Sequence, residues 1–287
     1  MGNAALSVFL GIFFAYYFKI SNTFYSRRVG TIPLQIGIVI LGATISMPYA
    51  LNVSSEYLPW ISLFVIISFF SGLILGRILG IHHRVAFLLS SGAAICGGTA
   101  MAAVAPIIKA KPQELLVAMT IVFLLNAIAI IFFPIVGSYL EMSNFEFGAW
   151  SALVIHDTSS VIGAALSYSN ESAQAAATLK LGRTIWLIPL ILIANWIRNK
   201  QIKAAKFPIF ILFFIAAIFT NSILNLNGEI TNFLQILSQA FLLIGLFCIG
   251  SQFDPNEIKS ISSKPLIMAL IIWAVVIPSA YALVKYF

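Results

Sequence analysis

Residues 91–106 read SGAAICGGTAMAAVAP, and this stretch decides how the chain is built. It lies in a long apolar segment, yet it contains Gly92, Gly97 and Gly98, each of which destabilises a helix interior by roughly 1 kcal/mol relative to alanine. Non-helical backbone is tolerated at membrane depth only where protein buries it or where it lines a polar cavity. We therefore predict a broken helix here. The alternative is that the small residues simply permit close helix packing.

The composition identifies the class of protein. Of the 287 residues 61% are hydrophobic and 9% are charged, with a mean hydropathy of +1.02, whereas soluble domains carry about 25% charged residues. We predict an all-α polytopic membrane protein, formed by one transporter-like domain over 1–287 with no soluble domain. The basic excess is explained by loop charges that orient the spans, so no nucleic-acid partner is expected. Cys96 and Cys248 lack ligand spacing, and no metal or other cofactor is predicted.

Apolar segments recur along the whole chain, each near the length of about 20 residues that a membrane-crossing helix needs. About ten are predicted, at 3–20, 29–48, 58–80, 86–108, 114–140, 147–167, 173–197, 206–225, 230–252 and 265–286. Three alternate loops are basic, around residues 19–28, 77–84 and 198–206, while Glu56, Glu171 and Glu229 lie in loops on the other side. The positive-inside rule therefore predicts cytoplasmic basic loops and external termini.

The loops around the fourth and sixth segments do not fit this simple alternation. Lys109 and Lys111 would be external and Glu141 and Glu146 internal if both segments crossed. The misfit disappears if 86–108 and 147–167 are re-entrant and enter from opposite faces. Broken helices that cross the membrane remain the alternative.

A weak internal repeat points in the same direction. The stretch IGIVILG at 36–42 resembles IGLFCIG at 244–250, and both lie between comparable apolar segments. Pairing segments one to three with segments eight to ten makes the related units inverted across the membrane. Inverted repeats with interrupted helices are typical of secondary transporters.

The sixth segment contains the most polar run at membrane depth. His156, Asp157, Thr158 and Ser159 are consecutive within an otherwise apolar stretch, and ionisable residues in a span usually mark a substrate or ion path. The plainer interpretation is that Asp157 caps a short helix, or that His156 is a structural hydrogen-bonding residue. The two roles are compatible, because the capped end of a broken helix is where a ligand would dock.

The seventh segment carries Lys180 and Arg183, three residues apart and so on one helix face. They lie about 10 and 15 Å into the segment at 1.5 Å per residue. Two compatible roles follow. Arg183 forms a structural ion pair with Asp157, or the basic face binds an anionic substrate, for which a guanidinium has a suitable planar geometry.

These motifs resemble the YeiH-like family of bacterial inner-membrane proteins, many of which carry a sulfate-exporter label. The resemblance rests on AICGGTAMAAVAPII, FGAWSALVIHDTSSVIGAAL and KLGRTIWLIPL and extends from the first segment to the last. Thr99, Ala152, Ser159, Ser160 and Gly182 depart from the commonest family residues. From the resemblance we also expect that an N-terminal span found in many relatives is missing here. The resemblance implies a polytopic plasma-membrane protein related to transporters with inverted repeats and crossed broken helices.

We expect a multi-pass secondary transporter of a small anion, such as sulfate, a related oxyanion or an organic anion, in the bacterial plasma membrane. A proton or sodium ion is the expected coupling partner, and a homo-oligomer is compatible with the sequence. The substrate site is predicted at Cys96, Gly97, Gly98, Thr99, His156, Asp157, Thr158, Ser159, Lys180 and Arg183, with Asp157 and His156 as coupling residues.

An anion channel, or a structural protein with a buried Asp–Arg pair, is the rival hypothesis. An enzyme is not expected, because no nucleotide loop, metal-ligand set or nucleophile elbow is present. A membrane-embedded enzyme with Cys96 as nucleophile and His156 as base remains an alternative.

Overall fold

The computed structural model describes residues 4–18, 31–197, 209–224, 226–251 and 263–286, and every regular element in these ranges is helical. The helices are α1 (Ala4–Phe18), α3 (Thr31–Gly42), α4 (Met47–Ile78), α5 (His83–Ala94), α6 (Gly98–Val104), α7 (Pro112–Tyr139), α8 (Asn144–Val154), α9 (Thr158–Tyr168), α10 (Asn170–Thr184), α11 (Leu187–Ile197), α12 (Ile209–Leu224), α13 (Gly228–Gly250) and α15 (Ser263–Tyr286). The predicted all-α class is therefore confirmed for this part of the chain.

Five helical stretches are long and apolar enough to cross a membrane. They are Met47–Ile78, Pro112–Tyr139, Asn170–Asn195, Gly228–Gly250 and Ser263–Tyr286. The third of these combines α10 and α11 across a short turn at Ile185 and Trp186. Each of the ten predicted segments overlaps at least one helix, but the count of ten membrane segments stays a prediction. Two of the predicted basic loops, 19–28 and 198–206, lie outside the described residues.

Helix α4 begins well before the predicted start of the third segment. The Ser46 side chain accepts a hydrogen bond from the Tyr49 N–H at 3.4 Å, and Pro48 lies in the first turn, where its missing N–H costs nothing. The polar residues 52–56 obscured this start in the sequence. Thr44 and Ser46 lie in the turn that ends α3 and begins α4, so the second predicted segment is also interrupted.

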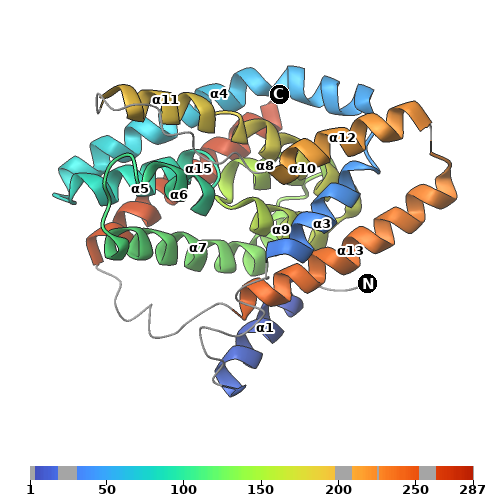
Figure 1. Cartoon of the computed structure of the whole chain (residues 1–287), viewed down its shortest axis with the longest axis horizontal. Coiled ribbons are helices and arrows are strands. Elements are labelled where there is room, and N and C mark those ends of the chain that lie inside the picture. Colours follow the sequence, from blue (N-terminus) through green and yellow to red (C-terminus); the bar gives the residue numbers. More distant parts are fainter. Residues whose placement is uncertain (1–3, 19–30, 198–208, 225, 252–262, 287) are drawn as a thin grey trace.

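Two long helices, α4 and α15, run antiparallel between the two ends of the molecule. At one end Gly76 of α4 lies beside Met268 of α15, with 3.5 Å between the sulfur and a Cβ built on the glycine. At the other end Lys285 of α15 donates to Glu146 of α8 at 3.1 Å. Figure 1 shows α5, α6 and the start of α7 at the first end, α12 meeting α13 at the opposite one, and α8, α9 and α10 between them.

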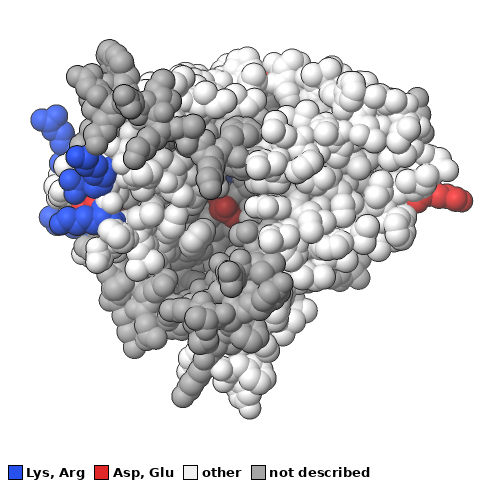
Figure 2. All heavy atoms as spheres, in the orientation of Figure 1, with Lys and Arg blue, Asp and Glu red and all other residues white. Residues whose placement is uncertain are grey.

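Charged side chains follow these two ends. On the face drawn in Figure 2, basic side chains gather at the α5–α7 end and an acidic group marks the opposite end, while the surface between them carries little charge apart from an acidic group near its centre. Most large exposed side chains on α4, α7, α12 and α13 are aliphatic or aromatic. An apolar middle with charged ends is the surface that a bilayer requires.

Candidate functional site

Two helices are broken in the middle of the molecule, and the breaks touch. The first separates α5 from α6 at residues 95–97, and the second separates α8 from α9 at residues 155–157. A Cβ built on Gly97 would lie 3.3 Å from the Asp157 Cα. Gly97 has φ +59° and ψ −122°, a conformation that side chains rarely allow. We call this meeting point, residues 95–97 and 155–157, the crossing.

Side chains satisfy the backbone carbonyls that the end of α8 leaves free. A helix ends with four carbonyls that have no partner within it. Ala152 and Leu153 accept from the Arg183 guanidinium at 3.1 and 2.7 Å, and Ile155 accepts from the Lys180 ammonium at 2.6 Å. The fourth carbonyl, that of Val154, accepts from the Trp273 indole N–H at 3.1 Å. All four oxygens are therefore bonded without help from water.

Arg183 also binds the end of the other broken helix. Its Nε donates to Ala94 at 2.7 Å and its Nη2 donates to Ala93 at 2.6 Å. The two preceding carbonyls of α5 accept from backbone N–H groups of residues 95 and 97 at 3.1 and 2.9 Å. One guanidinium thus joins the C-terminal ends of both broken helices, whose partial negative charge favours a cation.

The Lys180 side chain reinforces this junction. Its Nζ lies 3.4 Å from the Ala152 carbonyl, which Arg183 also contacts. Lys180 and Arg183 have exposed fractions of 0% and 1%. Among the described residues, the ion pairs within 4 Å include neither of these cations nor Asp157. The structural Asp157–Arg183 pair considered from the sequence is thus absent from the described contacts, and backbone carbonyls take its place.

Asp157 caps α9 at the other side of its break. Its carboxylate accepts from the Ser160 N–H at 3.2 Å and from the Ser160 hydroxyl at 3.3 Å. The neighbouring His156 is buried, and its backbone N–H donates to the Asn126 side-chain oxygen at 3.2 Å. His156 Nδ1 and Asn126 Nδ2 have no hydrogen-bond partner among the described residues. Asp157 therefore combines a capping role with a position beside the first break.

Burial divides the ten predicted site residues into two groups. Cys96, Gly97, His156, Lys180 and Arg183 are buried, whereas Gly98, Asp157, Thr158 and Ser159 are half-buried and Thr99 is exposed. The accessible group lies at the N-terminal ends of α6 and α9. No side chain caps the first turn of α6. Exposure is thus confined to the N-terminal side of the two breaks, and the cations lie on the C-terminal side.

Sequence reasoning missed some participants. The carbonyls of residues 93, 94 and 152–155 carry no signal in the sequence, because every residue has one. Trp273 lies on α15, far along the chain from the motif that it supports. Asn126 is different, because an amide in the middle of an apolar helix needs a partner, so the sequence itself marks it as an interhelical hydrogen-bonding residue. Among the described residues, no three His, Cys, Asp or Glu side chains gather as metal ligands would.

Comparison with known proteins connects this geometry to a family. The model of the family described as Conserved hypothetical protein 698 matches residues 1–269. A membrane protein of Bacteroides thetaiotaomicron named UPF0324 is 35% identical over 284 residues, which cover 98% of this chain and 86% of the relative. The chain belongs to the UPF0324 family of membrane proteins.

Two further UPF0324 relatives match most of this chain. The protein of Porphyromonas gingivalis is 36% identical over 94% of this chain and 83% of its own length, and that of Shewanella oneidensis is 37% identical over 88% and 80%. No solved structure gives a significant match. The resemblance found from the ICGG and IHDT motifs is confirmed, and so is a membrane location. The UPF0324 names specify no substrate.

Proposed function

We propose that the protein is a secondary transporter of a small anion, with the substrate bound on the accessible side of the crossing. The observation that carries the proposal is the asymmetry of the two breaks. The C-terminal ends of α5 and α8 are fully hydrogen-bonded, mostly to the buried cations Lys180 and Arg183. The N-terminal ends of α6 and α9, with Thr99, Thr158 and Ser159, remain accessible. Backbone N–H groups at helix N-termini bind anions, and hydroxyl groups donate further hydrogen bonds.

The charges around the crossing favour the same sign of ligand. Each helix end is equivalent to about half an elementary charge, positive at the N-terminus and negative at the C-terminus, so the two ends of each kind cancel. With both basic side chains as cations, Lys180 and Arg183 then exceed Asp157 by one positive charge. An anion bound in front of the crossing would neutralise this excess. In this proposal Arg183 attracts the anion through its positive charge and does not bind it directly, because its N–H groups already donate to backbone carbonyls.

The coupling of anion transport to a proton is inferred from the same charge balance. A proton on Asp157 would raise the positive excess, so proton and anion would bind more tightly together than apart. We therefore propose proton-coupled transport in which both move in one direction, with Asp157 as the coupling residue. The buried imidazole of His156, whose Nδ1 has no hydrogen-bond partner among the described residues, is the second candidate for this proton. Sodium in place of the proton is an outcome that the experiment below distinguishes.

Contacts at the ends of the broken helices support a re-entrant topology. Arg84 at the start of α5 lies 3.8 Å from Glu114 at the start of α7, so α5 and α6 leave and return at one end. Asn144 at the start of α8 donates to Glu171 at the start of α10 at 3.0 Å. Tyr57 packs on Phe145 at 5.4 Å between centroids, at the opposite end of α4 from Arg84. Two hairpins entering from opposite faces account for these contacts.

The packing of α3 on α13 supports the inverted repeat. The alignment that pairs Gly37 with Gly245 also pairs Leu34 with Leu242. A Cβ on Gly37 would lie 2.9 Å from Leu242, and a Cβ on Gly245 would lie 2.5 Å from Leu34. Such reciprocal contacts are the signature of a two-fold relation. We propose alternating access by movement of one bundle against the other, in the bacterial plasma membrane with external termini.

Flux measurements in reconstituted vesicles test the function. Labelled sulfate, phosphate, nitrate and small carboxylates are offered with no gradient, with a proton gradient and with a sodium gradient. We expect saturable uptake of one class of anion, accelerated by an inward proton gradient. Arg183→Gln, which removes the positive excess, should lose this uptake, and Lys109→Gln, which removes an exposed charge between α6 and α7, should retain it. Linear uptake that ignores both gradients would make the protein a channel, and vesicles that accumulate no anion would refute the proposal.

A further inference from the structure

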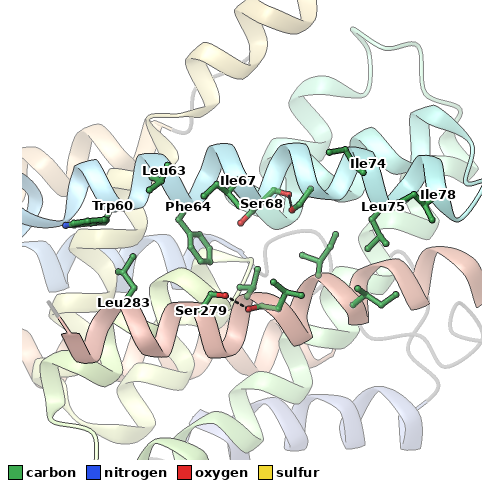
Figure 3. Close-up of a pocket in the computed structure, with 15 residues that line it drawn as sticks. Trp60, Leu63, Phe64, Ile67, Ser68, Ile74, Leu75, Ile78, Ser279 and Leu283 are labelled. Carbon is green, nitrogen blue, oxygen red and sulfur yellow. Dashed lines mark hydrogen bonds between the residues drawn. The ribbon is translucent and has the colours of Figure 1, made fainter.

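A groove lies outside the crossing, and no described residue fills it. It has a volume of about 480 Å³ and lies between α4 and α15, as Figure 3 shows. Its floor consists of buried residues, Phe64, Ser68, Ile272 and Val276. Its rims consist of exposed aliphatic residues, Leu63, Ile67, Ile74 and Val275. In Figure 3 the Phe64 ring extends from α4 toward α15.

The chemistry of the groove suits hydrocarbon. Two of its three serines donate within their own helices, Ser71 to the Ser68 carbonyl at 3.2 Å and Ser279 to the Val275 carbonyl at 2.7 Å. These hydroxyls therefore need no partner from outside, and the remaining walls are almost entirely apolar. A polar solute or an extended peptide would find too few hydrogen-bonding groups here.

The direction and length of the groove fit a bilayer. Along α4 it extends from Trp60 to Ile78, which is about 27 Å at 1.5 Å per residue and close to the hydrocarbon thickness of about 30 Å. Both walls are helices of membrane-crossing length. An acyl chain parallel to the membrane normal would therefore lie along the groove.

Basic side chains stand at one end of the groove. Arg77 is exposed in the last turn of α4, one residue before the lining residue Ile78. Lys264 at the start of α15 is exposed, and its Nζ lies 3.9 Å from a Cβ built on Gly80. Neither forms an ion pair with another described residue. The end of the groove therefore offers a guanidinium and an ammonium to a phosphate, which both groups bind.

We propose that this groove binds a phospholipid with an anionic headgroup, its acyl chain between α4 and α15 and its phosphate on Arg77 and Lys264. A second copy of the chain fits less well. A copy related by a two-fold axis along the membrane normal would bring both basic ends together, and like charges repel. The lipid would share a wall with the crossing, because the Arg183 guanidinium carbon lies 5.6 Å from the centroid of the Phe64 ring.

Lipid titrations of the purified full chain in detergent test this site. Phosphatidylglycerol and phosphatidylcholine with the same acyl chains are compared by native mass spectrometry. We expect phosphatidylglycerol to bind more tightly, and Arg77→Gln and Lys264→Gln each to weaken it about fivefold. Lys109→Gln, an exposed lysine in the loop between α6 and α7, is the matched control and is expected to have little effect. Equal binding of the two lipids by the wild-type chain would overturn the headgroup assignment.

The acyl position needs a separate variant. Ser279→Trp fills the groove and is expected to abolish the preference, whereas Thr220→Trp adds the same bulk to an exposed hydroxyl position on α12 and leaves it intact. Size-exclusion chromatography with light scattering is run on both. If Ser279→Trp binds lipid as well as Thr220→Trp does, the groove is not the site. If Ser279→Trp instead converts a dimer to a monomer, a second copy is the occupant and the proposal is wrong.

Discussion

Replacing Arg183 by methionine removes the group that joins the ends of α5 and α8. Arg183 donates four hydrogen bonds to carbonyls, of which only that of Ala152 keeps a second donor, Lys180. Each of the three orphaned carbonyls costs about 1–3 kcal/mol. Removing the burial cost of a guanidinium returns several kcal/mol of this sum. The net loss of stability is therefore expected to be about 3 kcal/mol.

Thermal unfolding in detergent micelles, followed by tryptophan fluorescence, measures this loss. We expect the Tm of Arg183→Met to fall by about 5–10 °C. That of Arg183→Lys should fall by less, because an ammonium can still donate to one helix end although it cannot reach both in one plane. The exposed Arg77→Met is the matched control and should retain the wild-type Tm. If Arg183→Met melts like Arg77→Met, the guanidinium does not hold the broken helices and the account of the crossing is wrong.

Three further predictions concern the neighbouring positions. Gly97→Ala should cost about 1–3 kcal/mol of stability, because the positive φ at this position strains any side chain. Gly182→Ala, whose new Cβ would meet no atom within 4 Å, is the control in the same melting assay, and equal Tm values would contradict the argument. Asp157→Asn should change the Tm little, since asparagine also caps helices. It should nevertheless remove the proton dependence of uptake in vesicles, and uptake that still follows the pH gradient would exclude Asp157 from coupling. The hydrogen bond from the Ser143 N–H and the contact with Lys285 hold the pKa of Glu146 below its ordinary value. This carboxylate therefore stabilises the fold above its unfolded pKa and loses that effect as pH falls through its folded pKa. Glu146→Gln should lower the Tm at pH 7 and match wild type near pH 3, and a difference that persists in acid would refute this assignment.

The breaks at the crossing could be predicted because local chemistry determines them. Gly97 and Gly98 weaken a helix wherever they occur, and a carboxylate beside hydroxyls at 157–159 marks a capped helix start. The same reasoning should have found the turn between α3 and α4, because Ser46 is also a cap. The apolar residues before Ser46 and the polar residues at 52–56 after it hid this helix start.

The partners of Lys180 and Arg183 could not be predicted. Their depth in an apolar helix showed that they needed partners, and Asp157 was the nearest acidic residue in the motif. The structure instead pairs them with carbonyls of residues 93–94 and 152–155. Those oxygens are free only because two helices end there, so their availability depends on tertiary structure rather than on residue type.

The most direct test of the central claim is protection of the crossing by the transported anion. In a Cys96→Ala, Cys248→Ala background, Thr99→Cys places a thiol at the exposed start of α6. A charged, membrane-impermeant thiol reagent should label it in vesicles, and a saturating concentration of an anion that the vesicles accumulate should slow labelling at least several-fold. Labelling at an unchanged rate in the presence of that anion would contradict a substrate site at the crossing.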